Sequence, residues 1–503
     1  MSWRSFFAKA FERREVGAPP LPWVRWVVRG CLLFQMGIVS WDALALMEPY
    51  GLRRAQADCT AYLGAARSLL HGEGLRMPSL FEPLPYGWMS EWPLGYPALI
   101  AFSSWLTGIE PFYISRWLNV GLYILSYLIM LFFFKSRADW LFLFIYPPNY
   151  TWNVAFPLSE NLFIPFFLLT IGSFERFYRD EKGWWMVGIG FLLPLLFLVR
   201  YSGLAVGIAL GLWGLWQGLC RNWREGLRWL VIAAFQGLWA GGYFLWNALS
   251  HPAQESGLSM RGMPVPPDFF WRLWQEVPFL RFAFLVGLLT VAALWKWGRP
   301  SFSLAEQKRD KLLWLLFLTQ GGLYAWSMIK GRVGIVDTRH FVLTLLPILL
   351  YAAERLWRTL PSSLLVSIAG IWVVWQLRNT YQHFRWSLEI PHLSYTYAER
   401  VRQAYDSLPP RSCIIGGSIA YILKGRRIDL CLGDWEGYFP LLLRDCPCLY
   451  VDCGIVDQRY ELGLGAGILW PFVKYCDKPC SAPVCLRRIV CASSDPKSSD
   501  ASP

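Results

Sequence analysis

The most regular feature of this sequence is a series of long apolar runs, separated by short polar segments rich in Lys and Arg. Most runs are about 17 to 22 residues long, the length of helix that crosses a ~30 Å hydrocarbon core. The pattern predicts eleven membrane-spanning helices, at 30–48, 113–134, 139–150, 159–175, 184–199, 203–219, 229–248, 279–295, 312–329, 341–353 and 361–378. The runs at 139–150 and 341–353 are short, so we expect tilting, breaks or extension into neighbouring residues there.

Another apolar stretch, at 94–106, is too short to span and begins with Trp-Pro-Leu-Gly-Tyr-Pro at 92–97. We expect it to form a helix at the outer interface. Counting it as a span would reverse the side of every later loop. With a cytoplasmic N-terminus and without that extra span, Lys and Arg concentrate in the inner segments, as the positive-inside rule predicts. These inner segments are 1–15, 135–137, 176–182, 221–228, 296–311 and 355–358.

The composition agrees with a polytopic α-helical membrane protein, because 55% of the 503 residues are hydrophobic and only 17% are charged. That distribution argues against a soluble protein of this size. The net charge of +13 comes from cations between the spans, so it reflects topology and does not indicate a nucleic-acid partner. The basic N-terminus resembles a signal peptide, but no small-residue cleavage site follows, and we expect an uncleaved first span.

Two large segments lie outside the membrane in this threading. One is the loop at 49–112, which belongs to a transmembrane domain at 1–378. The other is a small domain at 379–492, followed by a polar tail at 493–503 that is typical of disorder. Short β-like runs at 413–415 and 449–451 and a helical stretch at 417–424 predict an extracytoplasmic α/β domain.

Cysteines are unevenly distributed along the chain. Nine of the twelve lie in the C-terminal domain, and Cys59 lies in the first outer loop. Such density outside the membrane favours disulfide bonds. The alternative is a zinc site, but the spacing matches no standard zinc pattern and no His lies among the cysteines at 413–491.

Two acidic residues on the outer side are candidates for chemistry. Asp58 lies early in the first outer loop, where a carboxylate could act as a general base or orient an incoming hydroxyl or amine. Alternatively, it caps a helix at 59–70 that ends at Gly72. Glu160 follows Ser159 where the chain re-enters the membrane, a position at which ionisable groups usually face a cavity or a partner. Its alternative role is to favour the start of its own helix.

Several cations lie on the side where the charge rule disfavours them, and an anionic ligand would explain this. Arg is suited to bidentate contact with phosphate oxygens, although lipid headgroups offer the same chemistry. The candidate phosphate-binding residues are Arg200, Tyr201, Lys330, Arg332, Arg339 and His340. The chain has no Walker loop, dinucleotide fingerprint or His-Glu-x-x-His helix, which argues against an ATP-driven pump and a zincin protease.

In their order and shared side, these motifs resemble those of the GT-C superfamily of membrane glycosyltransferases, especially the bacterial family 39 type related to protein O-mannosyltransferases and aminoarabinose transferases. The residues that support the resemblance are Asp58 and Tyr62 with Ala65, Leu69, Leu70 and Gly72, the motif at 92–97, Arg116, Ser159 to Phe163, Arg200 to Gly203, and Arg339-His340 before Pro347.

The resemblance implies transfer of a hexosyl or pentosyl group from a polyprenyl-phosphate donor to a lipid, glycan or protein acceptor at the outer face of a bacterial inner membrane. Asp58 would be the base, with Tyr62, Ser159 and Glu160 supporting the site. The cations would stabilise the departing lipid phosphate. In relatives a second acidic residue often follows the first-loop Asp, whereas Cys59 stands here, so no metal or other cofactor is assigned.

Two other classes of protein remain open at this point. A transporter or flippase of lipid-linked saccharides would also bind phosphate with outer cations, but it would be expected to show paired halves with interrupted spans, and no such repeat is evident. A structural subunit with an outer disulfide-bonded domain would explain the cysteines but would leave Asp58 and Arg200 without a role.

Overall fold

The computed structural model describes residues 22–45, 57–72, 74–77, 87–88, 93–147, 150–250, 278–297, 302–329, 338–389, 403–405, 407–408, 413–415, 431–433, 448–452 and 486–491. The chain divides into two units, which are described separately. The first contains residues 1–44, 90–96 and 116–384, and the second contains residues 45–89, 97–115 and 385–503.

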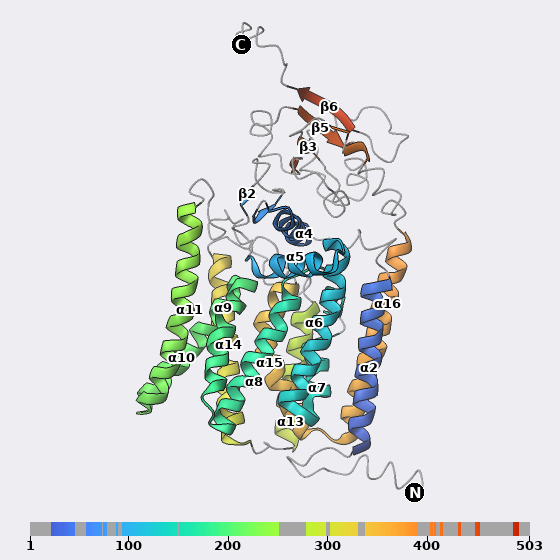
Figure 1. Ribbon diagram of the computed structural model, residues 1–503. Coiled ribbons are helices and arrows are strands. Elements are labelled where there is room, and N and C mark those ends of the chain that lie inside the picture. The colour runs from blue at the N-terminus through green and yellow to red at the C-terminus, as the bar shows by residue number, and fades with distance from the viewer. Residues whose placement is uncertain are drawn as a thin grey trace. The chain divides into compact units, whose positions relative to one another are not determined.

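The first unit is built from helices that run along a common direction (Figure 1). They are α2 (Pro22–Ala45), α6 (Pro111–Phe134), α7 (Ala138–Ile145), α8 (Glu160–Asp180), α9 (Trp184–Val199), α10 (Leu204–Leu219), α11 (Trp223–Ser250), α13 (Pro278–Trp297), α14 (Leu304–Ile329), α15 (Thr338–Thr359) and α16 (Ser362–Glu389), with short 3-10 helices η2 (Lys135–Arg137), η3 (Thr151–Ala155) and η4 (Tyr201–Gly203). Each of the eleven runs expected to span the membrane contains one of these helices within its described residues, which confirms the polytopic helical class.

Length and composition alone identify fewer spans than the eleven expected. Within the described residues, five stretches are long and apolar enough to cross a membrane: Pro22–Leu44, Pro111–Ile145, Tyr201–Leu219, Trp223–Leu249 and Leu280–Trp297. The apolar helix Trp184–Val199 is shorter. Helices such as α8 and α14 carry several charged residues near their ends. The number of spans therefore stays a prediction.

Two helix boundaries differ from the sequence expectation for physical reasons. The first helix begins at Pro22 and not at 30, and its early Arg29 lies 3.0 Å from a carboxylate oxygen of Asp139. Pairing a charge inside a helix lowers the cost of placing it there. The third predicted span ends at Ile145, not 150, because Pro147 follows and η3 continues the chain. All eight residues of α7 are buried.

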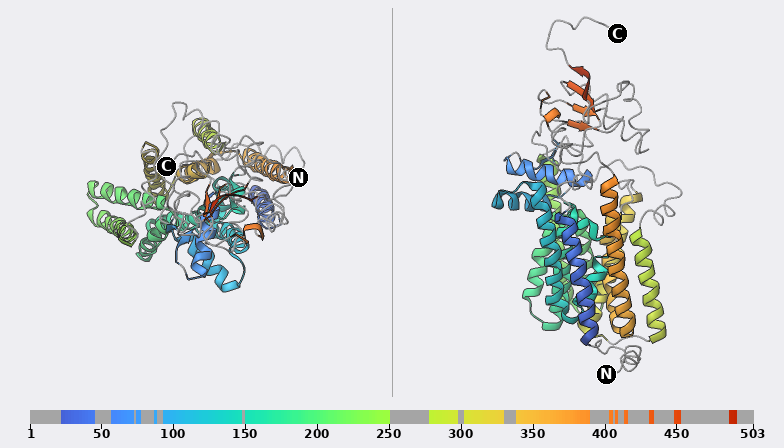
Figure 2. Two further views of the ribbon diagram at one scale, coloured as in Figure 1. Left: turned by 90° about the horizontal axis from the view of Figure 1, so that it is seen from above. Right: turned by 90° about the vertical axis from the view of Figure 1, so that its right-hand side faces the viewer.

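Packing in the first unit brings helices together that are distant in the sequence. α10 contacts α11 and α14, α8 contacts α9 and α14, and α15 contacts α7, α13 and α14. The first and last of these helices, α2 and α16, lie side by side in Figures 1 and 2. This arrangement leaves many large apolar side chains exposed along the helix flanks, as expected of a surface that faces lipid.

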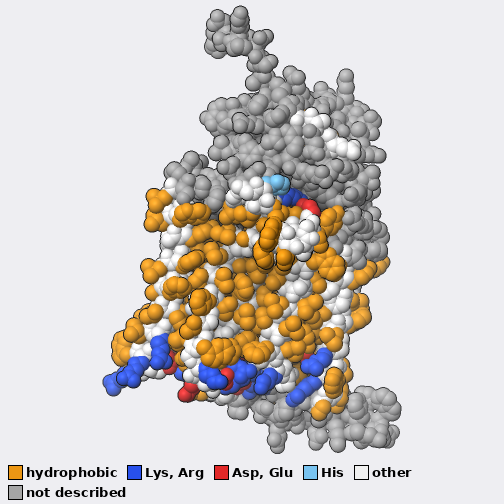
Figure 3. Space-filling view, in the orientation of Figure 1, with side chains coloured by type: hydrophobic (Ala, Val, Ile, Leu, Met, Phe, Trp, Pro, Cys, Tyr) orange, Lys and Arg blue, Asp and Glu red, His pale blue; other side chains and the backbone are white. Residues whose placement is uncertain are grey.

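Lys and Arg gather at one end of the first unit, where α9, α11 and α14 begin, and hydrophobic side chains cover the flank above them (Figure 3). We call this the basic end. Glu160 begins α8 and Asp180 closes this 21-residue helix, so Glu160 is separated from the basic end by about 30 Å along the helix. The ends of α8 are therefore about one hydrocarbon thickness apart.

A buried group of ion pairs connects three helices at the basic end. Arg309 of α14 is 1% exposed and contacts Glu175 of α8 at 2.7 Å and Glu354 of α15 at 3.3 Å. Glu354 also pairs with Arg137 of η2. Because each buried charge has opposite charges beside it, its desolvation cost is offset.

The second unit contains α4 (Ala57–Leu70), most of α5 (Gly95–Thr107) and two small sheets. Strands β1 (Arg76–Met77) and β2 (Gly87–Trp88) pair antiparallel. The other sheet has the order β4-β3-β5-β6, formed by β3 (Cys413–Ile415), β4 (Cys431–Gly433), β5 (Cys448–Asp452) and β6 (Leu486–Cys491). The two strands predicted from sequence are present as β3 and β5, whereas the helix predicted at 417–424 lies outside the described residues.

The expected disulfide bonds gain no support. No pair of described cysteine side chains is bonded, and Cys31 and Cys220 are free thiols. The side chains of the C-terminal cysteines lie outside the described residues.

Candidate functional site

The candidate site is built around the turn between α9 and α10, which holds Arg200. Arg200 has an extended backbone, with φ −151° and ψ 136°, and its N–H closes the last turn of α9 by donating to Leu196 O at 3.0 Å. Gly203 then returns the chain close to α9. A Cβ at Gly203 would lie 2.4 Å from the Leu196 carbonyl, so this tight turn requires glycine.

Arg200 contacts the start of α8. Its Nη1 lies 2.7 Å from Glu160 Oε1 and donates a hydrogen bond of 2.9 Å to Ser159 Oγ. The Glu160 side chain is 1% exposed, whereas that of Arg200 is 16% exposed. The buried carboxylate therefore holds a guanidinium that still reaches the surface. Ser159 is the residue before α8, but its hydroxyl makes no cap hydrogen bond.

A second group of polar side chains fixes the segment that leads into α8. Asn161 Nδ2 donates to the carbonyls of Asn153 and Phe156, at 3.1 and 2.9 Å. Asn119 of α6 donates to the same Phe156 carbonyl and accepts a hydrogen bond from Tyr96 Oη at 2.6 Å. These bonds satisfy buried polar groups and orient the first turn of α8, which carries Glu160.

Gln236 of α11 holds the Arg200 turn from the other side. Its Nε2 donates to Leu193 O at 2.9 Å and to Gly203 O at 3.1 Å, so one side chain joins α11, α9 and η4. A Cβ at Gly207 would lie 1.7 Å from Gln236 Oε1, which shows how closely α10 approaches. Tyr201 packs in an aromatic group with Phe197, Tyr243 and Phe244.

The structure thus brings three of the predicted site residues, Ser159, Glu160 and Arg200, into direct contact. Glu160 is also the first residue of α8, where an acidic residue favours the helix, so both roles expected for it are compatible. The sequence reasoning did not identify Asn119 and Gln236. Their only signal was an amide inside an apolar run, which does not reveal a partner.

Other predicted residues lie elsewhere or outside the described part. Asp58 is in the first turn of α4, which begins at Ala57, so it is not the residue before the helix, as an N-cap would be. Its side chain lies outside the described residues. Tyr62 is buried in the second unit, with 2% exposure.

The remaining cations also fall outside the described side chains. Lys330 and Arg332 are not among the described residues, and of Arg339 and His340 only the placement in α15 is described. Among the described residues, no group of three or more His, Cys, Asp and Glu could hold a metal ion.

Solved structures of ArnT from Cupriavidus metallidurans share this fold. The structure bound to undecaprenyl phosphate has a TM-score of 0.51 at 13% identity and covers 88% of this chain and 94% of that chain. The apo structure has a TM-score of 0.51 at 13% identity and covers 86% and 94%. The apo oligosaccharyltransferase of Archaeoglobus fulgidus has a TM-score of 0.49 at 12% identity and covers 86% and 70%, a likeness too weak to support an argument.

No protein-family model matches the sequence, and no curated protein sequence does. At 13% identity the likeness to ArnT concerns the fold alone. It agrees with the motif resemblance at that level, while the narrower relation to family 39 stays a prediction. The chain therefore shares the fold of the ArnT structures.

Proposed function

We propose that this protein is an integral membrane glycosyltransferase that moves a sugar from a polyprenyl-phosphate donor to an acceptor. The observation that supports this most directly is the buried Glu160 carboxylate holding Arg200 at the end of α8 remote from the basic end. The ArnT structure that shares this fold is bound to undecaprenyl phosphate. With a donor of that class the leaving group is a lipid phosphate, and no nucleotide sugar is needed.

In this proposal Arg200 acts on the leaving group. As the glycosidic C–O bond to phosphate breaks, negative charge grows on the lipid phosphate, and a preorganised guanidinium stabilises it. Glu160 and Ser159 hold Arg200 in place before the donor arrives, which lowers the cost of orienting it during the reaction. Further contacts with the same phosphate are proposed for four other cationic candidates, Lys330, Arg332, Arg339 and His340.

Asp58 is proposed as the group that accepts the proton from the attacking hydroxyl or amine as the new bond to the sugar forms. The acceptor class, whether lipid, glycan or protein, follows from no described residue. The role of Asp58 rests on its position in the motif at the start of α4.

The orientation is also part of the proposal. The basic end of the first unit (Figure 3) would face the cytoplasm under the positive-inside rule. The Arg200 end would then face the outside of a bacterial inner membrane, where nucleotide sugars are absent. No observation favours the transporter or flippase alternative.

The donor class can be tested directly. Purified protein in lipid nanodiscs would be incubated with matched sugars carried on polyprenyl phosphate or on nucleotides, in the presence of mixed lipid, glycan and peptide acceptors. Transfer from the lipid-linked set alone supports the proposal. Transfer from nucleotide sugars, or movement of intact donor across the membrane without cleavage, contradicts it.

A further inference from the structure

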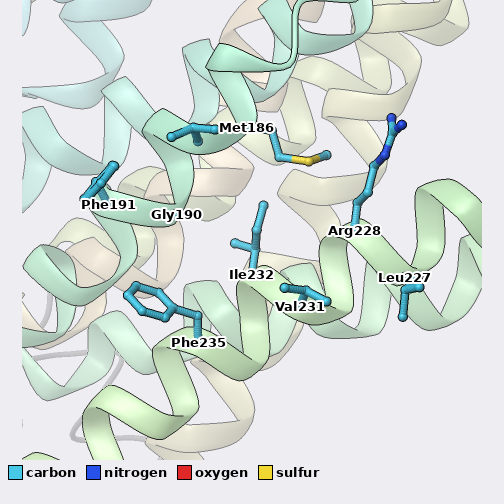
Figure 4. A pocket seen from close by; sticks show the side chains of 9 residues that line it. Met186, Gly190, Phe191, Leu227, Arg228, Val231, Ile232 and Phe235 are labelled. Atoms are coloured by element: carbon cyan, nitrogen blue, oxygen red, sulfur yellow. The ribbon is translucent and has the colours of Figure 1, made fainter.

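A groove lies between α9 and α11, and Arg228 lines it near the basic end of the first unit. It has a volume of about 520 Å³, within the range of roughly 300 to 1,000 Å³ typical of ligand pockets. Its walls are almost entirely apolar, and the one charged side chain that lines it is Arg228. Figure 4 shows Arg228 at one end, with Phe191 and Phe235 at the other.

The depth of Arg228 follows from the two helices. α9 and α11 both begin at the basic end, with Trp184 and Trp223, which are 57% and 68% exposed. Exposed Trp at helix ends is typical of the membrane–water interface. Arg228 comes five residues after Trp223, so its Cα lies about 7 Å further along the helix. Phe235, at the far end of the groove, lies about 10 Å beyond Arg228.

An arginine at this depth needs a partner, because an unpaired cation near hydrocarbon is costly. Several other cations of the basic end have one: Arg309 contacts Glu175, and Lys308 contacts Glu225 at 3.4 Å. Within the part of the chain that the structure describes, no carboxylate pairs with Arg228. A groove that is apolar along its length and cationic at its interfacial end is complementary to a lipid with an anionic headgroup.

We propose that this groove binds an anionic glycerophospholipid, with an acyl chain between α9 and α11 and the phosphate beside Arg228. Gly190 opens the groove, because a Cβ there would meet no atom within 4 Å. The bound lipid would brace α9, whose last residue, Val199, precedes Arg200. This site lies at the basic end and is independent of the proposed transfer reaction.

The test is lipid retention by the full-length protein. Protein from nanodiscs of equal phosphatidylglycerol and phosphatidylcholine would be released into the gas phase, and bound lipids would be counted by native mass spectrometry. We expect one retained lipid with about a fivefold preference for phosphatidylglycerol, the ratio that one cation near an anionic headgroup provides. Arg228→Gln should bring the ratio close to one, whereas Lys311→Gln, which removes an exposed cation of α14, should leave it unchanged.

A second pair of variants tests the groove itself. Gly190→Leu should reduce retention of both lipids, because its side chain fills the groove. Gly188→Leu is the matched control, since Gly188 also has open space around it but does not line the groove. Equal retention of the two lipids by the unmodified protein would overturn the proposal, as would an unchanged preference in Arg228→Gln or a retained polyprenyl phosphate in place of phospholipid.

Discussion

At the residue scale, the site depends on the buried carboxylate of Glu160, which holds the partly exposed guanidinium of Arg200. Glu160 and Arg200 could be singled out from sequence because Glu160 lies where the chain re-enters the membrane and Arg200 is a cation on the outer side, where the charge rule disfavours it. Their contact, across 40 residues, could not be predicted, since it depends on how α8 and α9 pack. Asn119 and Gln236 were missed because a neutral amide inside a helix is inexpensive once it is hydrogen-bonded.

Replacing Arg200 should affect activity more than folding, provided that Glu160 is neutralised with it. Arg200→Gln alone leaves a buried carboxylate without its cation, which costs about 3–5 kcal/mol. The double variant Arg200→Gln/Glu160→Gln removes that penalty and should fold. Its kcat should fall by about 10²- to 10³-fold, because the guanidinium that stabilises the charge on the leaving phosphate is gone. The melting temperatures of the purified variants measure the loss of stability, and their transfer rates measure the loss of kcat.

The control for Arg200 is Arg176→Gln, an arginine of similar exposure that pairs with Asp180 at the other end of α8. It should retain full transfer. A double variant as active as the unmodified protein would remove Arg200 from the mechanism.

For Asp58, the expected result is loss of transfer without loss of protein. Asp58→Asn keeps the size and polarity of the side chain but cannot accept a proton, so the rate should fall by about 10²- to 10⁴-fold. The yield of protein in the membrane should not change. Rates are compared with Asp180→Asn, at the exposed end of α8; equal rates in the two variants would return Asp58 to a helix-stabilising role.

At the scale of elements, apolar run length predicted where helices form, whereas charge pairing explains the early start of α2 and the extended end of α15. α2 starts earlier than expected because Arg29 meets Asp139. α15 extends past its apolar run to Thr359, and this extension carries Glu354 into the ion pairs with Arg309 and Arg137. From sequence, such a charged residue is interpreted as the end of a membrane span. The reason is that the local sequence does not reveal the ion-pair partner that lowers the cost of burying the charge.

Glu354→Gln should destabilise the helix bundle strongly. It leaves Arg309, which is 1% exposed, with less compensating charge, and breaking a buried pair costs about 3–5 kcal/mol. The thermal unfolding midpoint in detergent should fall by several degrees. Glu181→Gln, an exposed residue just after α8, should leave the midpoint within error, and equal midpoints for the two variants would show that the buried pairs contribute little.

At the scale of the whole molecule, the proposed orientation of the first unit rests on its scarce charges. The Lys and Arg residues expected between the spans gather along one end of the first unit (Figure 3), and the fold is shared with ArnT. The order of the motifs along the chain was informative about the fold, because it reflects which helix ends lie on the same side of the membrane. The C-terminal domain shows the limit of this reasoning, since two of its strands were predicted but its cysteine chemistry was not supported.

Orientation can be measured at a natural reporter. Cys220 is an exposed free thiol in the turn between α10 and α11, at the basic end. If that end is cytoplasmic, a membrane-impermeant maleimide should label the peptide containing Cys220 only after cells are permeabilised. Peptide mapping by mass spectrometry, with Cys220→Ser as the control, reports this site alone. Labelling of Cys220 in intact cells would invert the proposed topology.

In the proposed reaction, a sugar leaves a polyprenyl phosphate at the site that contains Arg200. The most direct measurement is the molar balance between free polyprenyl phosphate and glycosylated acceptor formed by purified protein from a lipid-linked donor. We expect one polyprenyl phosphate to be released for each sugar transferred, and both products to be lost together in the Arg200→Gln/Glu160→Gln variant. Absence of released polyprenyl phosphate, or release that is unaffected in the double variant, would contradict the proposed reaction.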